Sequence, residues 1–155
     1  MNKKAAPEHA VLELDRFLPY RLSVLSNRIS QDIAQLYGER FDLNVTEWRI
    51  LAVLGRYPDL SANEVAERTA MDKVAVSRAV ATLLKDGRLK RRIHAGDRRR
   101  SVLELSAKGY KIYDEVAPLA LRLERALLSH LDADEQHWLE RILGKLEAAE
   151  IAHFR

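Results

Sequence analysis

The chain has 155 residues, a length typical of one compact domain or of a small domain with an added oligomerisation element. It contains no cysteine, which excludes disulfides, thiolate metal sites and cysteine nucleophiles, and its formal net charge is only +3. No apolar run approaches the roughly 20 residues that span a bilayer, and the N-terminus leads into no signal-type apolar stretch, so we expect a cytoplasmic protein without a membrane partner.

The N-terminal part of the chain predicts two helices. Pro7 suits the first position of a short helix that would run to about Phe17. From Pro19 onward, apolar residues recur every three or four positions, which predicts a longer helix ending near Gly38.

Capping signals mark the helices that follow. Thr46 can cap a helix that stops before Pro58. Ser61, with Glu64 three residues later, has the pattern of a capping box and predicts a helix from residue 62 to about residue 69.

A further helix follows almost directly. Asp72 can cap a helix over residues 73–86, and Gly87 is placed to end it. The connection around residues 70–72 is short, so the two helices have the spacing of a helix-turn-helix motif. In that motif the second helix lies in the major groove of DNA.

The side chains of this second helix suit a DNA-reading face. Val76, Val80 and Leu83 fall on one side and would pack on the preceding helices. The opposite side carries small or hydrogen-bonding residues and no acid before Asp86, so phosphates and base edges can approach it. The residues that we expect to contact DNA are Lys73, Val74, Ala75, Ser77, Arg78 and Thr82, together with Ser61 and Asn63 of the preceding helix.

Basic residues are concentrated in residues 85–100, which hold eight Lys and Arg against two Asp, a net +6. This is a polyanion-binding footprint or, alternatively, a solvated basic loop.

Two strand-like segments, residues 89–93 and 102–105, flank a polar turn and predict a hairpin, or wing. Arginine is favoured in the narrow, negative minor groove that such a wing can reach. The wing residues are His94, Asp97, Arg98, Arg99 and Arg100. Asp97 would orient the Arg99 guanidinium or simply tighten the turn.

Two amphipathic helices close the chain. Ser106 can cap a long helix in which Pro118 implies a kink, and Asp132 with Glu135 marks the start of the last helix. A winged domain needs only part of their apolar surface, so self-association is the simplest way to cover the rest. The residues that we expect in this dimer interface are Leu127, Trp138, Leu139, Ile142 and Leu146.

Several short motifs between residues 51 and 109 follow one another in an order that is typical of a known protein family. They occupy residues 51–54, 61–66, 76–83, 87–92, 97–99 and 105–109. The most specific is the Asp-x-Arg element of the wing, followed by Leu105, Ser106 and Gly109. Together they resemble the MarR family of winged helix-turn-helix transcriptional regulators, and because the flanking helices agree in order and length, the resemblance covers nearly the whole chain.

The resemblance implies a mainly α-helical fold with a small β-hairpin wing and long N- and C-terminal dimerisation helices. It implies a homodimer that binds a pseudo-palindromic operator in double-stranded DNA, with Ser77 and Arg78 as recognition-helix contacts and Arg99 as the wing arginine. Residues 1–42 and 106–155 would contribute to dimerisation, and residues 43–105 would bind DNA. A ligand-responsive repressor is the expected function.

Many regulators of this kind bind a small aromatic or anionic effector between the dimerisation helices and the winged domain. The candidate pocket residues are Tyr20, Arg21, Ser23, Asn27 and Trp48. The competing interpretation makes Tyr20 and Trp48 core residues and places Arg21 and Asn27 in the dimer interface.

Two other functions stay open at this point, a sequence-neutral architectural DNA-binding protein and a winged-helix protein-interaction module. The basic wing and the acid-free helix face argue against the second of these. An enzyme is disfavoured because the sequence holds no recognisable nucleophile or metal motif, and we expect no cofactor and no metal site.

Overall fold

The computed structural model describes residues 9–94 and 96–149, with the backbone alone described at residues 94 and 97–100. Within these ranges the chain is mainly helical with one antiparallel hairpin, as predicted. The elements are α1 (Leu18–Gln35), α2 (Gly38–Phe41), α3 (Val45–Arg56), α4 (Ala62–Thr69), α5 (Lys73–Lys85), β1 (Leu89–His94), β2 (Asp97–Leu105), α6 (Ala107–Leu128) and α7 (Ala133–Ala148).

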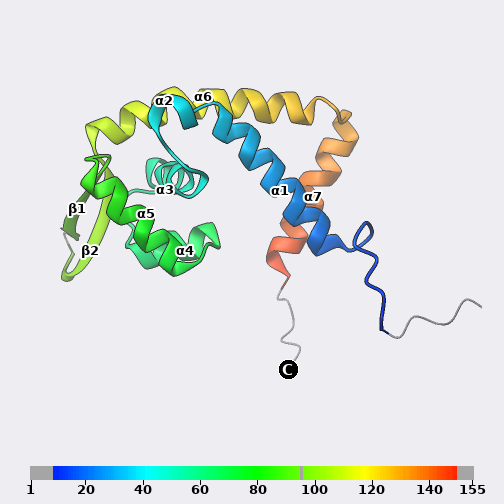
Figure 1. The fold of residues 1–155 in the computed structure, drawn as a ribbon, viewed down its shortest axis with the longest axis horizontal. Coiled ribbons are helices and arrows are strands. Elements are labelled where there is room, and N and C mark those ends of the chain that lie inside the picture. The colour runs from blue at the N-terminus through cyan, green and yellow to red at the C-terminus, as the bar shows by residue number, and fades with distance from the viewer. Residues whose placement is uncertain (1–8, 95, 150–155) are drawn as a thin grey trace, which may run out of the picture.

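The elements form one packed lobe, with α7 and most of α1 outside it, whereas the end of α1 packs on the lobe through Ile33 and Ala34. Figure 1 shows α3, α4, α5 and the hairpin grouped at one end, with α6 running along the edge of the molecule from this lobe toward α7. Neither α1 nor α7 contains a buried residue. No helix in the described ranges combines the length and the apolar character needed to cross a membrane.

The core of the lobe lies where α3 meets α4 and α5. Ile50, Leu51 and Leu54 of α3 are fully buried together with Val65 of α4 and Leu83 of α5. Burying an aliphatic side chain of this size contributes about 1.5–3 kcal/mol, so this cluster is the main source of the lobe's stability. It also fixes α4 and α5 relative to each other.

Helix starts follow the capping signals, with one correction. The predicted boxes at Ser61 and Asp132 are both formed. The cap of α3, however, is Asn44, whose side-chain oxygen accepts a hydrogen bond from the Glu47 backbone N–H at 2.9 Å. Thr46 therefore lies inside the first turn of α3, and its prediction as the cap was wrong. Asn44 and Glu47 are themselves spaced as a capping box, a better local signal than a lone threonine.

The predicted N-terminal helix is wrong over residues 9–17, which form a bend, a turn and chain without regular secondary structure, whereas Pro7 lies outside the described residues. Every residue from 9 to 17 is exposed, so a helix here would bury no face, and short helices without tertiary packing are unstable in water.

Farther along, α6 continues through Pro118, and β2 begins at Asp97, earlier than the predicted residue 102.

Candidate nucleic-acid interface

The turn between α4 and α5 has a fixed geometry. α4 ends at Ala70, which adopts the left-handed conformation with φ 50°, and the Met71 N–H donates back to the Ala66 carbonyl at 3.2 Å. Asp72 then caps α5 by accepting a hydrogen bond from the Ala75 N–H at 2.9 Å. These local bonds set the angle between the two helices and make the connection a helix-turn-helix.

α5 turns one face to the core and the other to solvent. Val76, Val80 and Leu83 are no more than 2% exposed. All six residues that the sequence assigned to the DNA-reading face of α5 are exposed, namely Lys73, Val74, Ala75, Ser77, Arg78 and Thr82. The fold therefore gathers them on one accessible helix face, and their contact with DNA stays a prediction.

Ser61 and Asn63 lie at the start of α4. The Ser61 hydroxyl accepts a hydrogen bond from the Glu64 N–H at 3.3 Å, and the Ser61 N–H donates to the Glu64 carboxylate at 2.7 Å. Ser61 thus has a capping role that does not depend on DNA, whereas Asn63 is exposed.

The hairpin pairs in register from Leu89 opposite Leu105 to His94 opposite Asp97, with an irregularity at Ile93 and His94. The backbone of Arg98, Arg99 and Arg100 belongs to β2, so these three residues lie in the wing. The side chains of His94 and residues 97–100 lie outside what the structure describes, and the predicted pairing of Asp97 with Arg99 stays a prediction.

Arg92 joins the hairpin to the helix-turn-helix. Its Nε donates to the Glu104 carboxylate at 3.1 Å, and its Nη2 pairs with the Asp59 carboxylate at the α3–α4 connection. Hydrogen bonding to Glu104, with Asp59 beside it, raises the pKa of Arg92 above its usual value. Close by, the Leu103 N–H donates to the Leu60 carbonyl at 2.8 Å. Asp59 and Arg92 are far apart in the chain and share no motif, so the sequence did not predict this link.

Arg88 is buried, with only 8% of its surface exposed. Its guanidinium donates to the carbonyls of Phe41 and Asp42 at 2.5 and 3.1 Å, which closes the C-terminal end of α2. Two of the eight basic residues in the segment 85–100, Arg88 and Arg92, therefore hold the fold together. The charge count overstates the positive charge that the segment presents to a polyanion.

Comparison with known proteins identifies this arrangement. A model of the MarR family matches residues 41–100, from the end of α2 into the wing. The HTH-type transcriptional regulator BilQ of Clostridium symbiosum is 33% identical over 100 residues, which cover 64% of this chain and 69% of BilQ. The chain belongs to the MarR family.

Solved MarR-family structures match most of the chain. A MarR/EmrR family transcriptional regulator from Acinetobacter sp. ADP1 has a TM-score of 0.79 and 28% identity, covering 88% of this chain and 96% of its own. MepR of S. aureus, solved with DNA, has a TM-score of 0.75 at 21% identity, covering 86% and 96%. PcaV of Streptomyces coelicolor, solved with its natural ligand, has a TM-score of 0.67 at 23% identity, covering 91% and 99%. These matches confirm the winged helix-turn-helix fold with its long terminal helices.

The five candidate effector residues of this MarR-family chain occupy two different environments. Tyr20, Arg21, Ser23 and Asn27 are exposed along α1. Trp48 is instead buried in the lobe, in ring contact with two tyrosines at centroid distances of 5.5 and 6.3 Å. Their joint role in a pocket stays a prediction.

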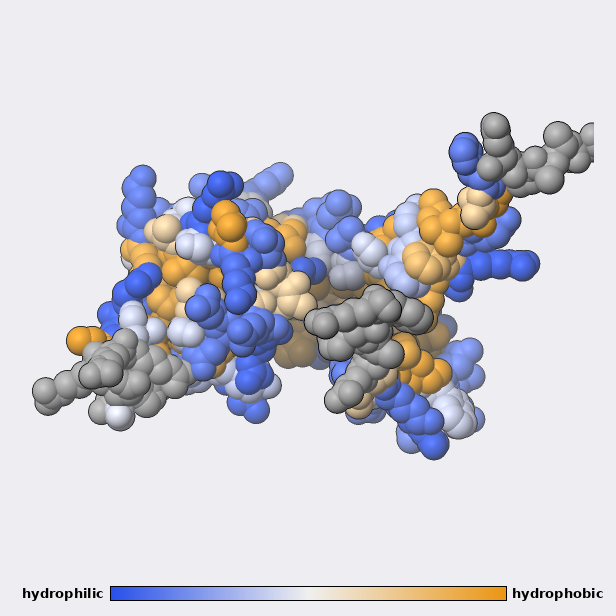
Figure 2. All heavy atoms as spheres, turned by 90° about the horizontal axis from the view of Figure 1, so that it is seen from below, coloured by the Kyte–Doolittle hydropathy of each residue, from blue (hydrophilic) through white to orange (hydrophobic). Residues whose placement is uncertain are grey.

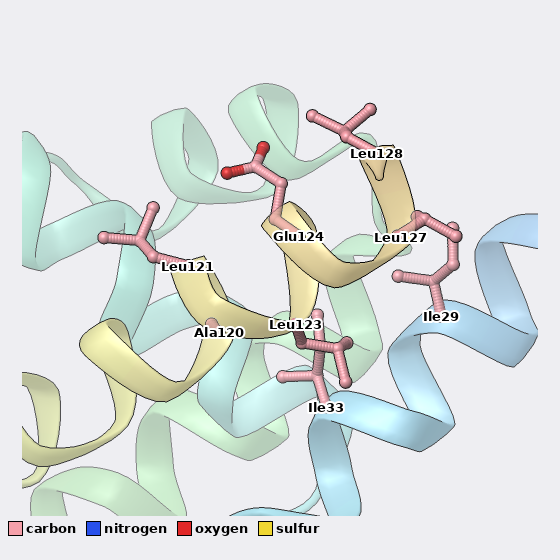
Figure 3. Close-up of a pocket in the computed structure, with 8 residues that line it drawn as sticks. All are labelled: Ile29, Ile33, Ala120, Leu121, Leu123, Glu124, Leu127 and Leu128. Atoms are coloured by element: carbon pink, nitrogen blue, oxygen red, sulfur yellow. The ribbon is translucent and has the colours of Figure 1, made fainter. Parts of the chain in front are cut away.

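A separate apolar hollow of about 410 Å³ lies between α1 and α6. Figure 3 shows Ile29 and Ile33 of α1 facing Leu123 and Leu127 of α6, with Glu124 at the rim. The complete lining is Ile29, Ile33, Ala120, Leu121, Leu123, Glu124, Leu127 and Leu128.

The apolar residues of the terminal helices are exposed in the single chain. Trp138 is 53% exposed and Ile142 is 50% exposed. In Figure 2 hydrophobic residues lie at the surface on the side of the molecule that holds α1 and α7. The other predicted interface residues, Leu127, Leu139 and Leu146, are also exposed. These helices therefore have apolar faces that residues 9–94 and 96–149 leave partly exposed.

Proposed function

We propose that this protein is a sequence-specific, double-stranded DNA-binding transcriptional regulator that acts as a ligand-responsive repressor. The observation that carries the proposal is the exposed, acid-free face of α5, which is followed directly in the chain by a basic hairpin. MepR, which has the same fold, was solved with DNA. Relatives and structural neighbours are transcriptional regulators, and we propose no catalytic activity for this one.

Each winged unit would contact both grooves of the duplex. α5 would enter the major groove, where Ser77 and Arg78 reach base edges or phosphates. The hairpin would follow the backbone and place Arg99 in the adjacent minor groove, whose narrow and negative floor favours arginine. Because Arg92 ties the hairpin to the α3–α4 connection, both contacts would move as one unit.

The exposed apolar faces of the terminal helices support a homodimer. Trp138 and Ile142 stay about half exposed within the described chain, and a second copy would bury them through a two-fold interface. We assign residues 1–42 and 106–155 to dimerisation and residues 43–105 to DNA binding. Two recognition helices related by a two-fold axis would bind a pseudo-palindromic operator.

An effector would act by favouring one of two arrangements of the recognition helices. PcaV, solved with its natural ligand, shows that a protein of this fold binds a ligand. For this chain an aromatic or anionic effector would lie at the junction of the terminal helices and the winged unit. A panel of aromatic acids should contain one that raises the melting temperature saturably, whereas no shift across a broad panel would refute ligand response.

Fluorescence anisotropy on two labelled duplexes at physiological salt tests DNA recognition. One duplex comes from the intergenic region beside the protein's own gene, and the other is a scramble of equal composition. A preference of about 1000-fold or more supports a sequence-specific regulator. Equal, salt-sensitive binding to both duplexes would favour an architectural protein, and binding to neither would favour a protein-interaction module.

A further inference from the structure

Val74 stands out on the DNA-facing side of α5. It is 57% exposed, although it is a branched apolar residue in the first turn of the helix. At 100° per residue, Val74, Arg78 and Ala81 lie on the outermost line of α5, opposite the buried Val76 and Leu83. Val74 would therefore be among the first side chains of α5 to meet the floor of a groove.

The first turn of α5 holds this side chain in a fixed place. The Asp72 carboxylate caps the helix through the Ala75 N–H at 2.9 Å, so the backbone at Val74 is ordered before any ligand binds. A valine in a helix also has one strongly preferred rotamer. An isopropyl group presented in this way loses little entropy when it is buried against a partner.

The major-groove edges of DNA offer one apolar partner for such a group, the C5-methyl of thymine. Guanine, adenine and cytosine present acceptors or amino groups at their edges, which would lose water against an isopropyl group without gaining a hydrogen bond. We infer that Val74 reads a thymine methyl in each operator half-site. This inference rests on the proposed function, because it requires α5 to lie in the major groove.

The position of the thymine relative to the other contacts follows from helix geometry. Val74 and Arg78 are four residues apart, which corresponds to a rise of about 6 Å along the helix axis. Base pairs are stacked about 3.4 Å apart, so the thymine lies within about two base pairs of the base that Arg78 contacts. An arginine most often contacts guanine, so the expected half-site places a thymine close to a guanine.

Selection from random duplexes with the full-length protein, followed by single thymine-to-deoxyuridine replacements in the selected site, tests this inference. Deoxyuridine removes the methyl group and leaves the hydrogen-bonding edge unchanged. For one thymine per half-site the replacement should weaken binding about fourfold, as expected for one buried methyl group. Replacing that thymine in both half-sites should weaken binding about fifteenfold.

Val74→Ala should make the protein indifferent to these replacements, so that its affinities for the thymine and uracil duplexes become equal. Val45→Ala is the matched control, because Val45 begins α3 and is among neither the predicted DNA contacts nor the predicted dimer contacts. This control should keep the full uracil penalty, and circular dichroism should show that both variants are folded.

The outcomes separate this inference from the proposed function. A selected consensus without any uracil penalty, or a penalty that Val74→Ala retains, would overturn the role of Val74 while leaving sequence-specific binding intact. A selection that enriches no sequence would overturn sequence-specific regulation, and the thymine contact with it.

Discussion

Ser106 joins two parts of the winged unit through one hydroxyl. Its Oγ accepts a hydrogen bond from the Gly109 N–H at 3.0 Å and so caps α6. The same hydroxyl donates to the Gly87 carbonyl at 2.6 Å, at the end of the recognition helix. The residue is only 6% exposed and Gly109 is buried, so water cannot readily replace the capping bond. Ser106→Ala removes both bonds at once.

The loss of unfolding free energy expected for Ser106→Ala follows from these two hydrogen bonds. Losing a helix N-cap costs about 1 kcal/mol. Here the capped Gly109 N–H is buried, which raises this cost to about 1–3 kcal/mol, and losing the part-buried bond to the Gly87 carbonyl adds about 1 kcal/mol, so we expect Ser106→Ala to lower the free energy of unfolding by about 2–4 kcal/mol. Asp132→Ala is the matched control, because Asp132 caps α7 through the Glu135 N–H at 2.9 Å but is exposed. It should cost only about 1 kcal/mol.

Urea denaturation followed by circular dichroism measures both values. Protein concentration must be the same for all variants, because the stability of a dimer depends on it. Ser106→Thr, which keeps the hydroxyl, should recover most of the loss. A Ser106→Ala variant that loses no more stability than Asp132→Ala would refute the argument that the buried hydroxyl holds the wing base and α6 together.

Four further predictions concern the core, the DNA contacts and the dimer. The Tyr37 hydroxyl is buried without a hydrogen-bond partner among the described residues, and burial raises its pKa to about 12. Since unfolded tyrosine ionises near pH 10, the stability of the wild type relative to Tyr37→Phe should fall by about 1 kcal/mol between pH 9 and 11, and an unchanged difference in urea titrations would contradict this. Arg78→Ala should cost about 1–3 kcal/mol in anisotropy titrations and relax the sequence preference; equal losses on all sequences would indicate a phosphate contact instead. Arg99→Ala should weaken binding and reduce the salt slope by about one unit, and wild-type binding would refute the wing assignment. Ile142→Glu should yield a folded monomer in analytical ultracentrifugation, whereas a persistent dimer would exclude α7 from the interface.

The helix-turn-helix was predictable because its signals are local. The Ser61 and Asp72 caps each act over three residues, so their side chains can be matched to helix starts by spacing alone. The apolar spacing of α5 likewise separated its buried face from its exposed face. The mixture of apolar and polar residues in two short segments, Leu89 to Ile93 and Val102 to Leu105, located the hairpin. The strand β2 is longer than predicted.

The missed features depend on contacts between distant parts of the chain. In the sequence, Arg88 and Arg92 cannot be distinguished from other members of a basic run. Arg88 is buried and donates to carbonyls at the end of α2, and Arg92 pairs with Asp59. Both arginines therefore stabilise the fold. The predicted helix over residues 9–17 failed for the opposite reason, since a proline start signal cannot replace a face to bury.

Hydroxyl-radical footprinting on the selected duplex tests the central claim, that two recognition helices related by a two-fold axis bind a pseudo-palindromic site. We expect two symmetric protected half-sites whose centres are about 10 base pairs apart, or a whole number of helical turns apart. A single asymmetric protected block, or protection spread evenly along the duplex, would contradict it.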